Sequence, residues 1–176
     1  MVSRCEVVEF GGGLGGTYIN NRDVFPSRVD YTVIEQPSFV ACGNMLSKEY
    51  DLPIRFKDSW KDICQNPCLI VFSAVLQYIE YPYEAIMSAV KLNPEFILID
   101  RTSFGADKKW RIQVNKDYYD EEVDYPFQRI DKKKIFTALE NYKLLEEWSN
   151  PFDPIIPKHT GLLFKNLTPR LGNHCE

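Results

Sequence analysis

The glycines of the segment VVEFGGGLGGTY, at residues 7–18, have the clearest chemical use in this sequence. Glycine adopts left-handed backbone conformations readily and leaves no Cβ in the path of a bound molecule. A carboxylate, Glu9, stands just ahead of the run, and a second, Glu35, ends the next apolar segment. Such a loop, flanked by two acids, predicts a binding site for a ligand that carries ribose hydroxyls.

Two ligand classes fit the spacing of this loop. Gly11, Gly13 and Gly16 form the G-x-G-x-x-G pattern of dinucleotide sites, which would indicate an NAD(P)-dependent oxidoreductase. Read instead as E-x-G-x-G-x-G from Glu9 to Gly15, the segment resembles the loop of class I S-adenosylmethionine-dependent methyltransferases. Glu9 favours the second class, because a carboxylate repels a pyrophosphate but attracts the ammonium and sulfonium of the methyl donor.

The segments around the loop alternate between strand and helix patterns. Short apolar runs predict strands at residues 4–10, 30–35, 54–56, 68–73 and 96–100. Helical spacing, with a proline opening the first run, predicts helices at residues 37–50, 82–92 and 132–140. This alternation predicts an α/β fold with a doubly wound, mostly parallel sheet in three layers, where ligands bind at the carboxyl ends of the strands.

The end of the chain departs from this alternation. Residues 142–148 and 159–165 have the pattern of two strands with no helix between them, which predicts antiparallel pairing. The expected sheet therefore has seven strands with an antiparallel C-terminal strand, in a single domain over residues 1–176. Residues 104–129 form a long polar and aromatic insertion after the fifth strand, which we expect to act as an acceptor lid.

Later segments extend the resemblance to class I methyltransferases. SAVLQYIEYP, residues 73–82, is similar to the segment that follows their fourth strand. FKDSW places Asp58 where such enzymes offer an acid to the adenine amino group. The two closing strands also look like the reversed end of that fold. These features follow one another in the same order as in the methyltransferases, which is more specific than a glycine loop alone.

Four strings narrow the resemblance further: EFGGGLGGTY, VIEQPSFVACGN, FSAVLQYIEYP and ILIDRT. Together they resemble a family of bacterial proteins described as methyltransferases, often associated with surface-polysaccharide genes. The resemblance implies the Rossmann-like fold, S-adenosyl-L-methionine as cofactor and a small-molecule or sugar-containing acceptor. Class members normally carry a helical cap ahead of the first strand, and this chain begins only a few residues before Glu9. We therefore expect the fold without that cap, which leaves a non-catalytic binding protein as a further alternative.

The resemblance also implies roles for individual residues in donor binding. The loop glycines would line the methionine and ribose portions, Glu35 would accept both ribose hydroxyls, and Asp58 would meet the adenine. Ser73, at the end of the fourth strand, is expected near the methionine moiety. The expected donor-binding residues are Glu9, Gly11, Gly13, Gly15, Tyr18, Glu35, Asp58, Ser73 and Gln77.

Three residues are candidates for the reacting centre. Asp100 could deprotonate an acceptor hydroxyl and Arg101 could pair with an acidic acceptor group, although an ion pair between the two is the simpler interpretation. The ring of Tyr78 could lie against the sulfonium, or it could pack in the core. Methyl transfer depends mainly on orientation and desolvation, so neither a catalytic triad nor a metal is expected.

The insertion at residues 104–129 carries aromatic and basic side chains suited to stacking on a polar acceptor such as a sugar. A partner interface or a small local core would use the same residue types. The residues concerned are Trp110, Arg111, Tyr118, Tyr119 and Tyr125.

Composition excludes several other functions. The net charge of −4, with no extended basic run, argues against nucleic acid as a partner. The longest apolar runs fall short of the roughly 20 residues that a membrane span needs, so a cytoplasmic protein is expected. The five cysteines and two histidines lack the spacing of a zinc site, and no metal is expected.

Overall fold

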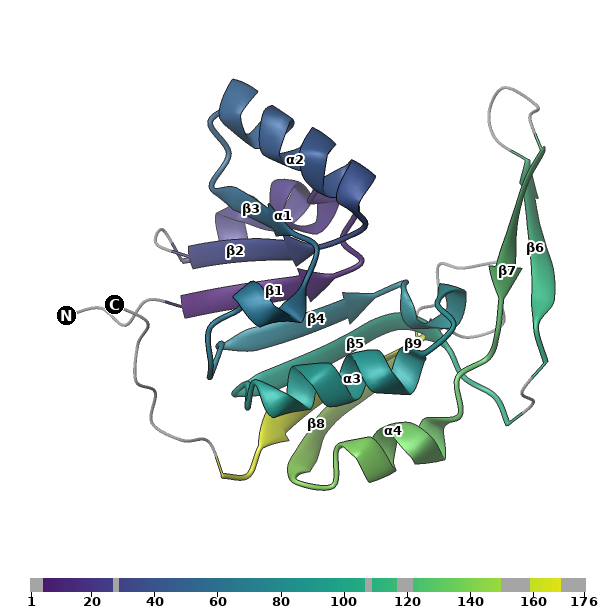
Figure 1. The fold of residues 1–176 in the computed structure, drawn as a ribbon. Coiled ribbons are helices and arrows are strands. Elements are labelled where there is room, and N and C mark those ends of the chain that lie inside the picture. The colour runs from purple at the N-terminus through teal and green to yellow at the C-terminus, as the bar shows by residue number, and fades with distance from the viewer. Residues whose placement is uncertain (1–4, 27–28, 107–108, 117–121, 150–158, 169–176) are drawn as a thin grey trace.

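Seven strands form one sheet in the order β3-β2-β1-β4-β5-β9-β8 (Figure 1). The computed structural model describes residues 5–26, 29–106, 109–116, 122–149 and 159–168. The sheet strands are β1 (Cys5–Phe10), β2 (Val29–Ile34), β3 (Ile54–Lys57), β4 (Leu69–Ser73), β5 (Phe96–Ser103), β8 (Tyr142–Ser149) and β9 (His159–Asn166). The helices are α1 (Gly16–Asn21), α2 (Pro37–Glu49), α3 (Pro82–Lys91) and α4 (Lys132–Ala138).

The first five strands pair in parallel, and β9 is antiparallel to both of its neighbours, β5 and β8. The predicted seven-stranded, mostly parallel sheet with a reversed last strand is thus confirmed. All three predicted helices form, and α2 opens with Pro37 at its first turn, where the missing amide hydrogen costs nothing. Sequence analysis missed the short helix α1, which continues directly from the glycine loop.

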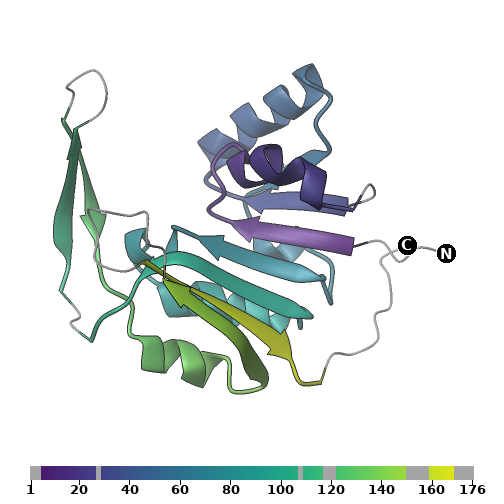
Figure 2. The same cartoon turned by 180° about the vertical axis from the view of Figure 1, so that it is seen from behind.

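Helices cover both faces of the sheet, and each face has its own apolar cluster. Figure 1 shows α3 and α4 in front of β4, β5, β9 and β8, and the view from behind in Figure 2 shows α1 over β1 and β2. Strand side chains alternate between the two clusters: Val8 and Phe72 belong to the cluster of α3 and α4, whereas Val7 and Val71 belong to the other. The sheet is therefore buried on both faces, as the continuous apolar strand sequences require.

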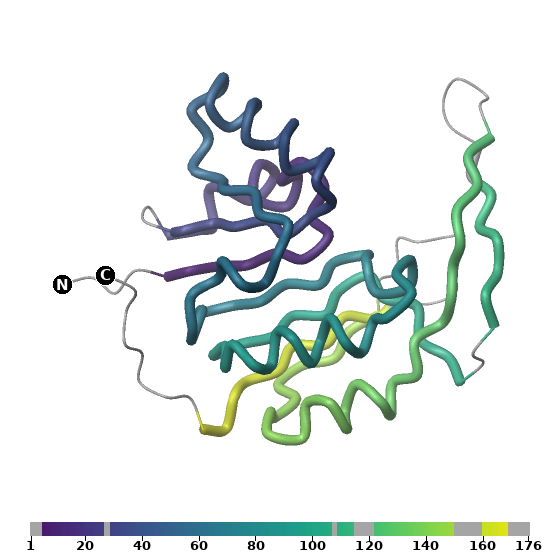
Figure 3. Tube along the Cα trace, in the orientation of Figure 1, coloured from purple at the N-terminus to yellow at the C-terminus, as the bar shows by residue number. Residues whose placement is uncertain are grey.

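The insertion after β5 forms a hairpin of β6 (Arg111–Lys116) and β7 (Glu122–Phe127), which make a separate two-stranded sheet. The trace in Figure 3 shows this hairpin standing off the main sheet, beyond the end at which β1 and β4 terminate. The long loop predicted here is wrong, because RIQVNK and EVDYPF form paired strands whose alternating side chains are the sequence signal for them. Tyr118 and Tyr119, two of the predicted acceptor residues, lie outside the described residues.

Within the described ranges, no helix combines the length and apolar character that crossing a bilayer requires.

Candidate functional site

The glycine loop leaves the end of β1 through left-handed backbone conformations. The φ angles of Gly11, Gly13 and Gly15 are +72°, +59° and +84°. A Cβ at Gly11 would overlap Val75, and one at Gly15 would lie 2.8 Å from Ile54 Cδ1. The loop therefore requires glycine at these two positions for space as well as for conformation.

Glu9 lies beneath this loop and is almost fully buried, with 1% of its surface exposed. Its Oε1 accepts a hydrogen bond from Thr17 Oγ1 at 2.6 Å, and its Oε2 accepts one from the Tyr31 hydroxyl at 2.9 Å. Burial raises the pKa of Glu9, while the two hydroxyl donors lower it. A Cβ at Gly12 would lie only 2.5 Å from Glu9 Oε2, so the loop backbone packs directly on the carboxyl group.

Glu35 fixes the other side of the loop. Its Oε1 accepts a hydrogen bond from the Gly13 amide at 3.1 Å, and its Oε2 accepts one from the Gln36 amide at 2.8 Å. The Gly11 amide donates to the carbonyl of Ile34, at the end of β2, over 2.9 Å. Each carboxylate oxygen keeps a second lone pair, so Glu35 can still accept hydrogen bonds from a ligand.

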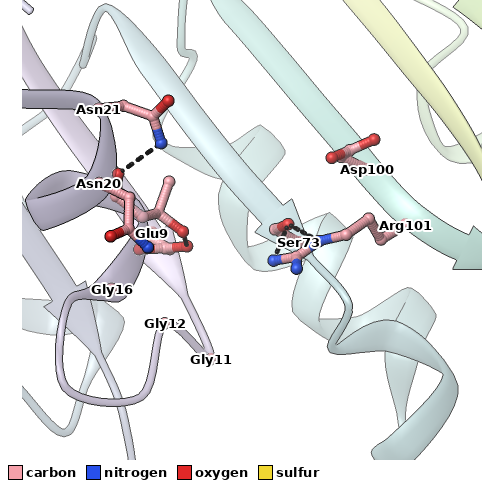
Figure 4. A pocket seen from close by; sticks show the side chains of 10 residues that line it. Glu9, Gly11, Gly12, Gly16, Asn20, Asn21, Ser73, Asp100 and Arg101 are labelled. Carbon is pink, nitrogen blue, oxygen red and sulfur yellow. Dashed lines mark hydrogen bonds between the residues drawn. The ribbon is translucent and has the colours of Figure 1, made fainter. Parts of the chain in front are cut away.

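A cavity of about 420 Å³ opens beside the loop, between α1 and the ends of β4 and β5 (Figure 4). This volume falls within the roughly 300 to 1,000 Å³ range typical of small-molecule sites. The cavity combines two carboxylates, one guanidinium and several neutral polar groups. Its lining residues are Glu9, Gly11, Gly12, Gly16, Thr17, Asn20, Asn21, Ser73, Asp100 and Arg101.

Arg101 and Ser73 are joined across the ends of β5 and β4. The Nε and Nη2 atoms of Arg101 donate to Ser73 Oγ at 3.0 and 2.9 Å (Figure 4). The ion pair with Asp100 that sequence analysis considered does not form among the described residues. Asp100 instead lines the cavity beside Arg101.

Seven of the predicted site residues do not line this cavity, which are Gly13, Gly15, Tyr18, Glu35, Asp58, Gln77 and Tyr78. The Tyr18 ring stacks on Phe25, with ring centroids 5.6 Å apart, and contacts the core residue Tyr31. Asp58 is exposed just after β3. The amide of Gln77 is buried and its Nε2 donates to the carbonyl oxygen of Arg101.

Tyr78, in the short 3-10 helix η3 (Leu76–Tyr78), faces the hairpin. Its hydroxyl donates to Gln113 Oε1 at 3.3 Å, and its ring meets Tyr125 edge-on at 5.2 Å between ring centroids. Burial raises the pKa of the Tyr78 hydroxyl. Tyr78 therefore packs at the base of the hairpin, which agrees with the packing alternative considered for it from the sequence.

Sequence analysis missed four polar residues at the site. Thr17, Asn20 and Asn21 reach the cavity or Glu9 from α1, a helix too short to show periodicity. Tyr31 reaches Glu9 from the neighbouring strand β2, where β1 and β2 pair Glu9 with Val33. The polar residues directly after the last glycine were the available signal, because a loop that binds a ligand commonly continues into a helix whose first turn faces it.

No group of three or more histidine, cysteine, aspartate or glutamate side chains in the described part of the chain could hold a metal ion.

Solved structures with the same arrangement of elements place the chain in a known fold. A S-adenosylmethionine-dependent methyltransferase from Clostridium acetobutylicum ATCC 824 superimposes with a TM-score of 0.64 and 11% identity, covering 94% of this chain and 85% of that one. A SAM-dependent methyltransferase from Methanosarcina mazei gives 0.66 and 10%, covering 95% and 94%. The N-terminal domain of EvdMO1, solved in the presence of SAH and D-fucose, gives 0.56 and 11%, covering 92% and 75%.

This chain therefore has the class I methyltransferase fold, as the sequence predicted. No protein-family model matches the sequence, and no curated protein matches it either.

Proposed function

We propose that the protein is a S-adenosylmethionine-dependent methyltransferase that acts on a small-molecule or sugar-containing acceptor. The observation that carries the proposal is the carboxyl group of Glu9, buried directly beneath the glycine loop in contact with the Gly12 backbone. A pyrophosphate held by this loop would lie against that acid and be repelled. A ligand with an ammonium and a sulfonium is attracted to the same position. A nicotinamide dinucleotide is therefore the weaker candidate.

The residues around the loop fit the rest of such a donor. Gly11 and Gly12 line the cavity with backbone alone. Glu35 stands at the end of β2 with free lone pairs for ribose hydroxyls, and exposed Asp58 follows the adjacent strand β3, where it can meet an adenine amino group. Ser73 lines the cavity and would lie near the methionine portion.

The donor supplies a methyl group on a sulfonium, which is reactive without further activation. A nucleophile of the acceptor attacks the methyl carbon in line with the sulfur, the carbon–sulfur bond breaks, and S-adenosylhomocysteine (SAH) remains. The protein has to orient the two molecules and exclude water. Asp100, at the cavity and without an ion-pair partner among the described residues, would accept the proton from an acceptor hydroxyl.

The hairpin is our candidate for acceptor selection. Trp110, Arg111 and Tyr125 offer rings and a guanidinium on an element next to η3 and the end of β5. Carbohydrates stack on aromatic side chains, and EvdMO1 was solved in the presence of D-fucose. The resemblance of the sequence to proteins associated with surface-polysaccharide genes supports the same acceptor class.

A ligand screen by thermal denaturation tests the donor. We expect SAH and S-adenosylmethionine each to raise the melting temperature, with a shift that grows with ligand concentration, and NADH to leave it unchanged. Stabilisation by NADH alone would refute the proposal. A methyl-transfer assay with labelled donor against a panel of sugars and sugar nucleotides then separates an enzyme from a non-catalytic binding protein of the same fold.

A further inference from the structure

Strand β5 departs from regular alternation at Asp100 and Arg101. Ile97 and Ile99 point into the apolar cluster beneath α3 and α4, and continued alternation would drive Arg101 into the same cluster. The pairing of β5 with β9 instead shifts register between Ile99 and Thr102, and Arg101 has a left-handed φ of +48°. This bulge turns Arg101 so that it lines the same cavity as Asp100.

The strained backbone at Arg101 is held in place by Gln77. A residue with a Cβ is strained in the left-handed region, so it persists there only where its surroundings fix it. Gln77 is fully buried, and its Nε2 donates to the Arg101 carbonyl oxygen at 3.0 Å. The Gln77 carbonyl in turn accepts from the Gln128 amide at 2.9 Å, which ties this corner to the base of the hairpin.

The guanidinium of Arg101 is fixed by a neutral partner. Its Nε and one Nη2 hydrogen point at Ser73 Oγ, which leaves the Nη1–Nη2 edge of the group without a bond among the described residues. This edge can bind a carboxylate or phosphate end-on with two parallel hydrogen bonds. Arg101 is exposed at the cavity and forms no contact ion pair in the described ranges, although its positive charge lowers the pKa of buried Glu9 across the cavity. The guanidinium is therefore oriented, and no carboxylate in the described ranges is in salt-bridge contact with it.

We propose that Arg101 is an anion-binding subsite that takes a carboxylate or phosphate group of a ligand in this cavity, with Ser73 and Gln77 as its positioning residues. The inference rests on the proposed function and deepens it. The anion has two possible sources, which are the carboxylate of the methyl donor's amino-acid portion and an acidic group on the acceptor. The bulge in β5, the left-handed backbone of Arg101 and the buried amide of Gln77 together orient one guanidinium toward the cavity. An arginine that only stabilised the fold would not require this strained arrangement.

Arg101→Gln, with Arg55→Gln as the matched control, tests this subsite in the full-length protein. Arg55 is also an exposed arginine, but it lies on β3 with Glu6 and Asp30 within 3.7 and 3.9 Å, and it does not line the cavity. Calorimetry would first measure the binding of SAH and of 5′-methylthioadenosine, which lacks the amino-acid portion, to the free protein. It would then measure the binding of glucuronate and of inorganic phosphate to protein already saturated with SAH. Arg101→Lys keeps the charge but not the bidentate edge.

We expect Arg101→Gln to lower the affinity for one anionic ligand by about 10- to 100-fold. Arg101→Lys should lower this affinity less, and Arg55→Gln should leave it unchanged. Loss of SAH affinity with unchanged 5′-methylthioadenosine affinity identifies the donor carboxylate as the anion. Unchanged SAH affinity with loss of glucuronate or phosphate binding identifies an acidic acceptor.

Two results would overturn the subsite. The first is wild-type affinity of Arg101→Gln for every ligand tested. The second is equal weakening of SAH and 5′-methylthioadenosine, which would indicate a general distortion of the cavity. The proposal that S-adenosylmethionine is the donor is refuted separately if the wild-type protein binds neither SAH nor 5′-methylthioadenosine. In that case the glucuronate and phosphate titrations, repeated with the unliganded protein, would decide whether Arg101 binds an anion.

Discussion

The glycine loop after β1 and the hairpin after β5 both stand at the end of the sheet that carries the cavity, but they are built in different ways. In the loop, the Gly11 amide bonds the carbonyl of Ile34, the Gly13 amide bonds Glu35, and Glu9 lies beneath with two hydroxyl partners. The hairpin is a separate two-stranded sheet that exposes Ile112 and Val114. The glycine loop, the proposed donor site, is therefore fixed by internal bonds, whereas the hairpin, the proposed acceptor element, forms a sheet of its own.

The largest effect should come from filling the space behind the loop. Gly11→Ala combines a positive φ with an overlap between the new Cβ and Val75, and we expect it to lower the free energy of unfolding by about 3 kcal/mol. Urea denaturation would measure the loss. Gly16→Ala is the control, because Gly16 begins α1 and a Cβ there meets nothing within 4 Å. Equal stabilities of the two variants would contradict a loop fixed by close packing.

Removing the acid that holds the far side of the loop should act mainly on binding. Glu35→Ala deletes the acceptor of the Gly13 amide and the oxygens offered to the ribose. We expect the affinity for SAH to fall by about 100-fold, measured by calorimetry. Glu49→Ala, at the exposed end of α2, should bind as the wild type does. An unchanged affinity in Glu35→Ala would remove Glu35 from the donor site.

The attachment of the hairpin can be broken without touching the loop. Tyr78→Ala removes the edge-on contact with Tyr125, and we expect it to cost about 1 to 2 kcal/mol of stability. Amide exchange in β6 and β7 should become faster while SAH affinity stays within about twofold of wild type. Tyr81→Ala removes a nearby exposed tyrosine, and it should change neither the stability nor the amide exchange of β6 and β7. Loss of SAH binding in Tyr78→Ala would show that the two regions are not independent.

The smallest effect concerns the charge beneath the loop. Burial raises the pKa of Glu9 above its usual 4.5, so its contribution to stability is complete below pH 4.5 and is lost as the pH rises through the folded-state pKa. Glu9→Gln cannot titrate. The stability of the wild type relative to Glu9→Gln should therefore decline as the pH is raised above 4.5 in a series of urea denaturations. A constant difference across that range would mean that Glu9 ionises as freely as in the unfolded chain.

The glycine loop was the easier region to predict from the sequence. Glu9 and the glycines are contiguous, Glu35 ends the next strand, and both elements show clear strand patterns. The hairpin was predicted as a loop, because its strands carry polar residues and Pro126 interrupts one of them. For Tyr78 the sequence allows both a contact with the ligand and packing in the core, because a ring in a short helix gives no periodic signal that separates the two.

By itself the sequence determined the order along the chain of the seven sheet strands and of α2, α3 and α4, the reversed last strand and the loop that needs glycine. Each of these depends on local conformation or on the alternation of apolar residues. Only the tertiary structure decided that Tyr31 bonds Glu9, that Gln77 holds Arg101, and that Arg101 bonds Ser73 instead of Asp100. These contacts depend on strand register and on one bulge, and a shift of a single residue turns a side chain to the opposite face of the sheet.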